Sequence, residues 1–331
     1  MKIYKLTIVF LIVDIVFISL LLVLYGPFKE KMIVKLSDSK IAYSLWNEKD
    51  IWENMVSYNT EYSVNEDIVS VFDEDEEQIE ELNEYEKAIL TKGDNEYYKL
   101  INLKIDGFNA YLAVIYDPSK VKLIHSAKFN TGNSQETILN MCKRYKGTVC
   151  INGGRFVDYG SGSDTPVGYI IKDGKVIWPA NGKDTTKAKI IGITYDNELV
   201  LMNTTAKDAI KKGVRDALEF GPFLIVNGED AKITNYKIGG YLGASRVAIG
   251  QRKDGIILFL VGDGAHGNGV TVASVRETLR KYGAYNAANL DGGASSQLVI
   301  NNKLINKPKN ILGELLTNGR RVVSGFGMIL E

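Results

Sequence analysis

Histidine and cysteine are scarce in this chain of 331 residues, which contains two of each. His125 and His266 are the only histidines, so a multi-histidine metal site is excluded. Cys142 and Cys150 form neither a CxxC pair nor the spacing of a Cys/His metal site. Two interpretations of the cysteines stay open: a disulfide, if the domain lies outside the cell, or two small residues packed in the core.

Glycine and proline are absent from residues 37–92, and this part of the chain is strongly acidic. Residues 37–95 contain 17 acidic and 4 basic residues, a net charge of −13, whereas residues 96–331 contain 31 basic and 21 acidic, a net charge of +10. Ile79, Leu82 and Tyr85 place an apolar stripe on one face of a helix, which predicts a partly helical stalk over 37–95. The cationic remainder favours anionic ligands such as phosphate-bearing polymers, unless the acidic segment only balances its charge.

Long hydrophobic runs are absent except near the amino terminus. Leu6 to Tyr25 is apolar apart from Thr7, Asp14 and Ser19, and it has the length of a helix that spans a bilayer. No small-residue cleavage pattern follows it, so we predict an uncleaved anchor over residues 1–36. Lysines flank both ends of the run, so charge does not settle its orientation.

Residues 96–331 alternate short strand patterns with turns and three helix patterns. The strands and strand pairs are expected at 97–105, 110–116, 121–125, 148–151, 168–179, 189–201, 246–250, 256–261 and 286–290. The helices are expected from Asn133 to Gly147, from Thr205 to Gly213 and from Thr271 to Gly283. The pattern predicts an α+β fold, with a mixed β-sheet core flanked by helices, preceded by the transmembrane helix and the stalk.

Two of the expected strands end in paired glycines beside polar residues. Val149 to Ile151 leads into Asn152-Gly153-Gly154-Arg155, and Ala287 to Leu290 leads into Asp291-Gly292-Gly293-Ala294-Ser295-Ser296. Glycine lets the backbone turn sharply and lets a ligand approach the main chain, because no Cβ stands in the way. Both turns are therefore candidates for one site at the ends of the strands.

A third glycine loop, Gly262-Asp263-Gly264-Ala265-His266-Gly267, matches the G-x-G-x-x-G pattern of dinucleotide-binding proteins. In those proteins the third glycine lies in the first turn of the helix, whereas here Asn268-Gly269-Val270 intervenes before Thr271. We therefore predict no dinucleotide site. A serine nucleophile is also excluded, since the chain has no G-x-S-x-G elbow.

Five segments, taken in chain order, resemble the phosphodiester glycosidase family. They are the turn at Asn152-Gly153-Gly154, Glu219-Phe220-Gly221-Pro222-Phe223, Ser245-Arg246-Val247-Ala248-Ile249-Gly250, the loop at 262–267 and the turn at Asp291-Gly292-Gly293. The resemblance extends from about Tyr97 to the end of the chain. It implies a hydrolase that acts on sugar-phosphate diesters, with its catalytic domain on the outer side of the cell membrane. One departure is Arg155, because the family usually has an aromatic residue directly after the glycines.

The chemistry of such a cleavage suggests roles for several residues. Asp291 and Asp263 are the candidate acid, base or nucleophile, and their separation decides between retention and inversion. Arg246 suits a phosphate because its planar fork donates two hydrogen bonds, although a structural ion pair is the alternative. His266 is a candidate proton donor, with a structural role as the alternative.

The remaining candidates bind substrate. Asn152 with the amides of Gly153 and Gly154 suits an acetamido group or a phosphate oxygen, and Arg155 favours more anionic polymers. Ser295 and Ser296 either bind the ligand or cap the turn. The other candidates are Gly221, Gly264, Asn289, Gly292 and Gly293.

These observations predict an anchor over 1–36, a stalk over 37–95 and a glycosidase-like catalytic domain over 96–331 that needs no cofactor. The expected partner is a phosphate-bearing glycan or sugar 1-phosphodiester of the cell envelope or an exopolysaccharide, and not a nucleic acid. Two other functions stay open. One is a glycan-binding surface protein without activity; the other is a phosphodiesterase in which Asp263, Asp291 and Asn289 hold a hard divalent cation such as calcium.

Overall fold

The computed structural model describes residues 83–91, 93, 95–129, 136–157, 165–179, 183–233 and 243–330. The chain divides into two compact units, Met1–Asn54 and Met55–Glu331, and all the described residues belong to the second. The predicted anchor and the stalk before Asn83 lie outside the described residues. Among those that are described, no helix is long and apolar enough to cross a membrane.

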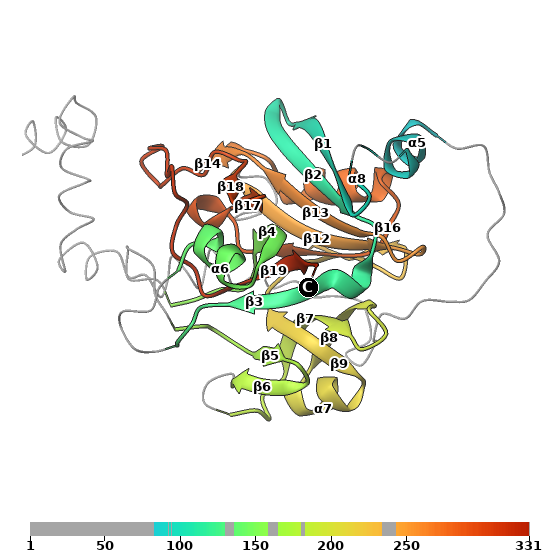
Figure 1. Ribbon diagram of the computed structural model, residues 1–331, viewed down its shortest axis with the longest axis vertical. Coiled ribbons are helices and arrows are strands. Elements are labelled where there is room, and N and C mark those ends of the chain that lie inside the picture. Colours follow the sequence, from blue (N-terminus) through green and yellow to red (C-terminus); the bar gives the residue numbers. More distant parts are fainter. Residues whose placement is uncertain are drawn as a thin grey trace, which may run out of the picture. The chain divides into compact units, whose positions relative to one another are not determined.

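Three antiparallel sheets form the framework (Figure 1). The seven-stranded sheet has the order β1 (Tyr98–Ile105), β2 (Phe108–Ile115), β13 (Ile257–Gly262), β12 (Arg246–Arg252), β16 (Ala284–Leu290), β10 (Phe223–Val226) and β11 (Glu229–Asp230). One five-stranded sheet has the order β18 (Lys303–Leu304), β17 (Leu298–Ile300), β4 (Gly147–Asn152), β19 (Ser324–Ile329) and β3 (Val121–His125). The other has the order β6 (Lys175–Trp178), β5 (Ile170–Lys172), β9 (Val214–Glu219), β7 (Ala188–Thr194) and β8 (Leu199–Thr204).

In the part of the chain that the structure describes, the helices are short and few. They are α5 (Glu84–Leu90), α6 (Ile138–Arg144), α7 (Ala206–Lys211) and α8 (Val272–Lys281), with the 3₁₀ turns η1 (Pro118–Lys120) and η4 (Gly293–Ser295). A small hairpin of β14 (Gly264–Ala265) and β15 (Asn268–Gly269) follows β13. The described chain is thus mostly β-sheet.

One hydrophobic core is shared by all three sheets, because alternate residues of each strand point to opposite faces. In β2, Ala113 and Ile115 belong to this shared core, whereas Leu112 and Val114 pack on the outer face with residues of α8 and α5. The outer faces of the other two sheets are covered in the same way, by α6 and by α7. Each sheet therefore places one face in the shared core and covers the other with a helix.

The turn and cap signals in the sequence place most elements correctly. Asp106 and Gly107 both have positive φ, 51° and 82°, and close the tight hairpin between β1 and β2. Thr205 and Thr271 cap α7 and α8 as predicted, and Gly283 has a positive φ of 78° just beyond α8. The hairpins at 168–179 and 189–201 and the pair at 246–261 are also confirmed.

The expectation of a mixed sheet is wrong. Every pairing between the described strands is antiparallel. Residue patterns along one strand show which side is buried, but they do not encode the direction of its neighbour. Pairing direction follows from how the chain returns, and here many neighbours are joined by hairpins.

The ends of α6 also differ from the prediction. Its N-cap is Thr137, whose hydroxyl accepts from the Asn140 N–H, and Asn133 lies outside the described residues. The left-handed residue after the helix is Lys146 with a φ of 54°, not Gly147, which begins β4. A Cβ on Gly147 would lie 2.6 Å from the Cys150 sulfur, so packing explains this glycine.

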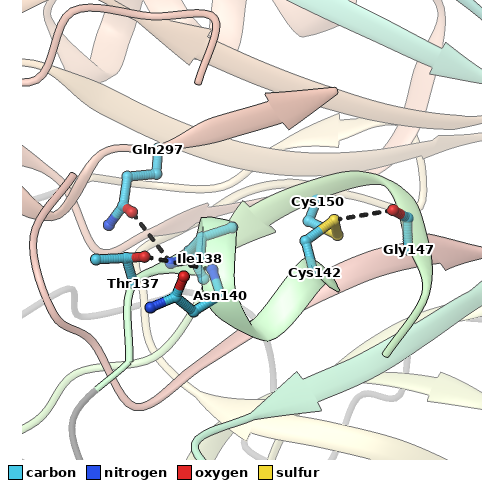
Figure 2. Close-up of a disulfide and its surroundings, with 7 residues drawn as sticks. All are labelled: Thr137, Ile138, Asn140, Cys142, Gly147, Cys150 and Gln297. Carbon is cyan, nitrogen blue, oxygen red and sulfur yellow. Dashed lines mark hydrogen bonds between the residues drawn. A yellow bond between two sulfur atoms is a disulfide. The ribbon is translucent and has the colours of Figure 1, made fainter. Parts of the chain in front are cut away.

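Cys142 on α6 and Cys150 on the outer face of β4 form a disulfide (Figure 2). Their Cα atoms are 6.0 Å apart, and the Cys142 sulfur lies 3.2 Å from the Gly147 carbonyl oxygen. The bond joins α6 to the strand that ends at Asn152. Of the two interpretations of the cysteines, the disulfide is therefore the correct one.

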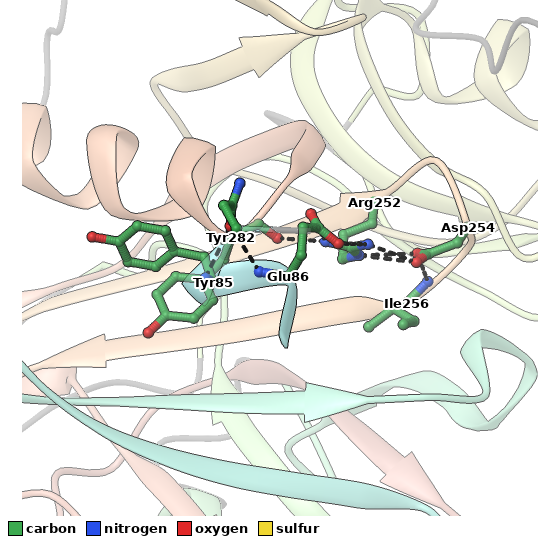
Figure 3. A network of polar contacts seen from close by, with 7 residues as sticks. Tyr85, Glu86, Arg252, Asp254, Ile256 and Tyr282 are labelled. Carbon is green, nitrogen blue, oxygen red and sulfur yellow. Dashed lines mark hydrogen bonds and ion pairs between the residues drawn. The ribbon is translucent and has the colours of Figure 1, made fainter. Parts of the chain in front are cut away.

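Helix α5 packs on the body formed by the three sheets although it precedes residue 96. Asn83 caps the helix, Ile89 is fully buried with residues of α8 and β2, and Tyr85 meets Tyr282 edge-on at 5.2 Å. Figure 3 shows Glu86 in the same network as Arg252, whose guanidinium contacts the carboxylate at 2.7 and 2.8 Å. The end of the acidic segment is therefore part of the folded body.

Candidate active site

The Asp291 turn is joined to the end of β4 by three hydrogen bonds. The Asn152 side-chain nitrogen donates to the Asp291 carbonyl at 2.7 Å, and the Asp291 N–H donates to the Gly153 carbonyl at 2.9 Å. The Asn152 side-chain oxygen accepts from the Gln297 N–H at 2.9 Å. Asn152 is fully buried and Asp291 is 9% exposed, so the two paired-glycine turns form one unit.

The amides of Gly153 and Gly154 do not serve as ligand donors, contrary to expectation. The Gly153 N–H donates to the Ser324 carbonyl at 2.9 Å, and the Gly154 N–H donates to the Ser324 hydroxyl at 3.1 Å. Each N–H carries one proton, which is already used. A Cβ on Gly153 would lie 2.3 Å from Leu218, so this turn needs glycine for close packing.

The segment Glu219 to Pro222 lies against this unit from the opposite side. The Glu219 carbonyl oxygen lies 3.1 Å from where a Cβ on Gly154 would be. The Asn289 N–H donates to the Pro222 carbonyl at 2.9 Å, and the Asn289 side-chain nitrogen reaches the Gly221 carbonyl at 3.4 Å. The Gly221-Pro222 peptide is cis.

Asn289 brings an unused acceptor to this place. Its side chain is 1% exposed, its nitrogen donates to the Leu290 carbonyl at 2.9 Å, and its oxygen has no hydrogen-bond partner. A buried acceptor without a partner costs free energy that a bound donor recovers. This is the feature expected of a ligand-binding residue.

Glu219 is the site residue that the sequence prediction missed. It ends β9, and burial raises the pKa of its carboxyl, an effect that the nearby charges of Arg155 and Lys189 oppose. Burial likewise lowers the pKa of Lys189 to about 8, against the opposing effect of Glu219. A carboxyl that keeps its proton above the ordinary range suits general-acid catalysis. The sequence signal that could have identified Glu219 is its place in the segment Glu219 to Phe223, one of the five that resemble the family.

Arg246 lies beside the Asp291 turn at the start of β12. It pairs with Gly262 at the end of β13, and its Nε donates to the Val270 carbonyl at 3.3 Å. A Cβ on Gly292 would lie 2.8 Å from the Ser245 carbonyl oxygen and 3.8 Å from the Arg246 Cδ. The arginine is 7% exposed, so its charge acts in a largely water-free setting.

Asp263 follows β13 and contacts the carboxyl-terminal loop. Its carboxylate accepts from the Lys307 N–H at 2.8 Å. Burial raises the pKa of Asp263, against the effects of Lys307, Asn306 and Lys309. Tyr111, whose pKa is raised first by its own burial and then by Asp263, is the neighbour on β2.

The loop at 262–267 forms a hairpin and not the start of a helix. His266 is exposed at the tip between β14 and β15. A Cβ on Gly264 would lie 2.6 Å from the Cα of Gly269, so this glycine permits close backbone packing. The geometry agrees with the rejection of a dinucleotide loop.

The residues after Asp291 continue as η4. Gly293 has a positive φ of 58°, and its N–H donates to the Ser245 carbonyl at 2.7 Å. Ser295 and Ser296 are buried, and the Ser296 hydroxyl has no hydrogen-bond partner. Within the described residues, no group of three or more His, Cys, Asp and Glu side chains is placed to hold a metal ion.

All five segments singled out in the sequence thus meet through main-chain contacts. Residues 145–329 match the family model for phosphodiester glycosidase. The chain belongs to the phosphodiester glycosidase family. The match includes both paired-glycine turns, Glu219 and Arg246.

One protein of related sequence and one solved structure are similar to this chain. The SPbeta prophage-derived uncharacterized protein YomE of Bacillus subtilis (strain 168) is 30% identical over 190 residues, which are 55% of this chain and 28% of the relative. This chain therefore spans little more than a quarter of the length of that curated relative. The catalytic domain of zebrafish N-acetylglucosamine-1-phosphodiester alpha-N-acetylglucosaminidase, auto-inhibited by its pro-peptide, has a similar fold. Its TM-score is 0.60 at 21% identity, over 71% of this chain and 82% of that chain.

Proposed function

We propose that this phosphodiester glycosidase is a hydrolase that cleaves the glycosidic bond of sugar 1-phosphodiesters. The observation that carries the proposal is the joining of Asn152, Asp291 and the Glu219 segment around one pair of glycines. The main chains of Glu219 and of the Asp291 turn both contact this pair, and glycoside hydrolysis uses two carboxylic acids.

We assign Glu219 as the general acid and Asp291 as the base or nucleophile. In the reaction, the bond between the anomeric carbon and the bridging oxygen breaks, and that oxygen leaves with the phosphate. Glu219 gives its proton to the departing phosphate, and an oxygen of water becomes bonded to the anomeric carbon, either directly or after a covalent step on Asp291. The products are a free sugar and a phosphomonoester.

Arg246 is the proposed phosphate-binding residue, and Asn289 the proposed ligand of the sugar. Arg246 lies next to the Asp291 turn and its planar fork matches two phosphate oxygens. The unpartnered oxygen of Asn289 accepts a hydrogen bond from a hydroxyl or amide group of the sugar. The zebrafish protein of similar fold is an N-acetylglucosamine-1-phosphodiester alpha-N-acetylglucosaminidase, which supports this substrate class for the proposal.

The same proposal places the catalytic domain outside the cytoplasm, held to the cell membrane by Leu6 to Tyr25, with envelope or exopolysaccharide glycans as substrates. The disulfide between Cys142 and Cys150 supports an oxidising compartment. The apolar run supports an anchor.

The test is an assay of wild type, Asp291→Asn and Glu219→Gln with a hexosamine 1-phosphate methyl diester, which measures free sugar and methyl phosphate. We expect hydrolysis by wild type and a loss of at least 100-fold in each variant, with both melting temperatures within a few degrees of wild type. Dialysis against EDTA should leave the rate unchanged. A rate that falls with the chelator and returns with calcium favours metal-assisted chemistry, and tight binding of the diester without product indicates a glycan-binding protein.

A further inference from the structure

Four aromatic rings from separate parts of the chain form a connected cluster, which we call the aromatic platform. His125 ends β3, Phe129 follows it, Tyr145 follows α6 and Trp178 ends β6. The His125 ring centroid is 5.4 Å from that of Phe129 and 5.8 Å from that of Tyr145, and Phe129 meets Trp178 edge-on at 5.6 Å.

The aromatic platform begins one strand away from the candidate active site. His125 pairs directly with Ser324 of the neighbouring strand β19. Ser324 is the residue that binds the amides of Gly153 and Gly154. Gly153 after β4 and Ser324 on β19 therefore lie between the Asp291 turn and His125 of the platform.

The platform is neither a closed core nor a fully exposed patch. All four rings are partly buried, and Phe129, Tyr145 and Trp178 pack on buried hydrophobic residues while keeping part of their surface open. Aromatic rings that show an open face beside polar groups are suited to stacking on the apolar face of a sugar ring.

Two ion pairs accompany the rings, Arg144 with Glu136 at 2.7 Å and Lys172 with Asp216 at 3.3 Å. The Arg144 guanidinium lies 4.7 Å from the centre of the Tyr145 ring, and its NH2 group also donates to the His125 carbonyl. Lys172 on β5 is close enough to His125 to act on its charge, as is Arg144. Burial, with these two cations, lowers the pKa of His125, so the imidazole is neutral at pH 7 and contributes a ring and not a charge. Its Nδ1 donates to the Ser126 carbonyl at 2.7 Å.

We propose that the aromatic platform binds the sugar units next to the one being cleaved, and that the preferred substrate is therefore a chain of phosphodiester-linked sugars. The rings hold the sugar units by stacking on their apolar faces, next to the Arg144–Glu136 and Lys172–Asp216 ion pairs. This inference rests on the proposed function, because it concerns the same site.

The experiment compares synthetic oligomers of one, three and six hexosamine 1-phosphate units. With wild type we expect KM to fall at least 10-fold from one unit to six, at a nearly constant kcat. Trp178→Leu keeps an apolar side chain without the ring, and it should remove this length dependence while turnover of the single unit stays within twofold. The matched control is Tyr195→Leu, since Tyr195 is 59% exposed at the turn between β7 and β8, and it should behave as wild type.

Equal KM values of wild type for one and six units would overturn the platform while leaving the proposed function intact. If Trp178→Leu lowers kcat/KM by the same factor for all three lengths and also lowers the melting temperature, the Trp178 ring serves packing. That result would also overturn the platform. If wild type hydrolyses none of the oligomers, the proposed function fails. Titration calorimetry with the hexamer then tests separately whether the platform binds sugar units. Binding that weakens at least 10-fold in Trp178→Leu and not in Tyr195→Leu then supports it, and equal affinities overturn it.

Discussion

The side-chain nitrogen of Asn152 donates to the main-chain carbonyl of Asp291 at 2.7 Å, across 139 positions of the sequence. Asn152 ends β4 and Asp291 directly follows β16, which belongs to a different sheet, so this bond and its neighbours hold the ends of two sheets together. Asn152 is a positioning residue, since both ends of its amide are bound to the protein's own main chain.

Replacement of Asn152 by alanine should lower the free energy of unfolding by about 2 to 4 kcal/mol, because it leaves two buried main-chain groups without partners. Urea denaturation measures this loss. Asn203→Ala, at an exposed position of β8, is the control and should cost less than about 0.5 kcal/mol. Equal stability of the two variants would show that the Asn152 bonds contribute little.

Replacement of Arg246 by lysine should reduce kcat/KM by about 30- to 1000-fold, roughly 2 to 4 kcal/mol, since a point charge cannot make two parallel hydrogen bonds. Arg276→Lys is the control, because Arg276 pairs with Asp230 on α8 and β11 away from the glycine turns. Rates on a single-unit diester compare the two. A normal rate for a folded Arg246→Lys protein would remove this residue from the site.

The pH dependence of the rate tests Glu219 as the acid. Its pKa is raised by burial, and the rate should fall as pH rises through that pKa, because the protonated form is then lost. The positive charge of Lys189 lowers the pKa of Glu219, so Lys189→Met should move this fall to higher pH. Lys175→Met, at an exposed position of β6, should not move it. A shift in the opposite direction would contradict the assignment.

The shifted pKa values of Glu219 and Lys189 change the free energy of unfolding with pH in opposite directions. The raised pKa of Glu219 contributes stability that is complete below the pKa of the unfolded chain and is lost as pH rises through the folded value. Lys189 has a pKa of about 8 against an ordinary 10.5, so the unfolded chain binds its proton more tightly and the free energy of unfolding should rise between these two pH values. Urea denaturation from pH 7.5 to 10.5 should show this rise in wild type and a smaller one in Lys189→Met.

The disulfide should stabilise the fold by about 2 to 3 kcal/mol, the chain-entropy estimate for a loop closed by Cys142 and Cys150 at a sequence separation of 8. We expect the Cys142→Ser, Cys150→Ser double variant and the reduced wild type to unfold at the same lower urea concentration. A double variant as stable as the oxidised protein would show that the bond only follows the packing of α6.

Helix α5 should be necessary for full stability although it belongs to the acidic segment. Glu86→Gln removes the charge that pairs with Arg252, whose side chain is 9% exposed, and should cost about 1 to 3 kcal/mol. Asp208→Asn breaks the exposed pair with Lys211 and should cost less than about 0.5 kcal/mol. A protein that starts at Glu96 also loses the buried Ile89, and it should melt below one that starts at Asn83.

Local sequence determined the turns, caps and buried faces of this protein. A pair such as Asp106-Gly107 or a cap such as Thr271 acts on backbone groups within a few positions, so its effect is readable without the rest of the chain. The order of the polar glycine segments was also sufficient to indicate the family.

Only the tertiary structure decided which of those groups are available for chemistry. The amides of Gly153 and Gly154 are taken by Ser324, which lies 170 positions from Gly154, and the raised pKa of Glu219 comes from burial by segments distant in sequence. Antiparallel pairing and the approach of Cys142 to Cys150 likewise depend on how the chain returns upon itself. Hydrogen bonds and desolvation act over a few ångströms of space, and sequence separation does not reveal which groups come that close.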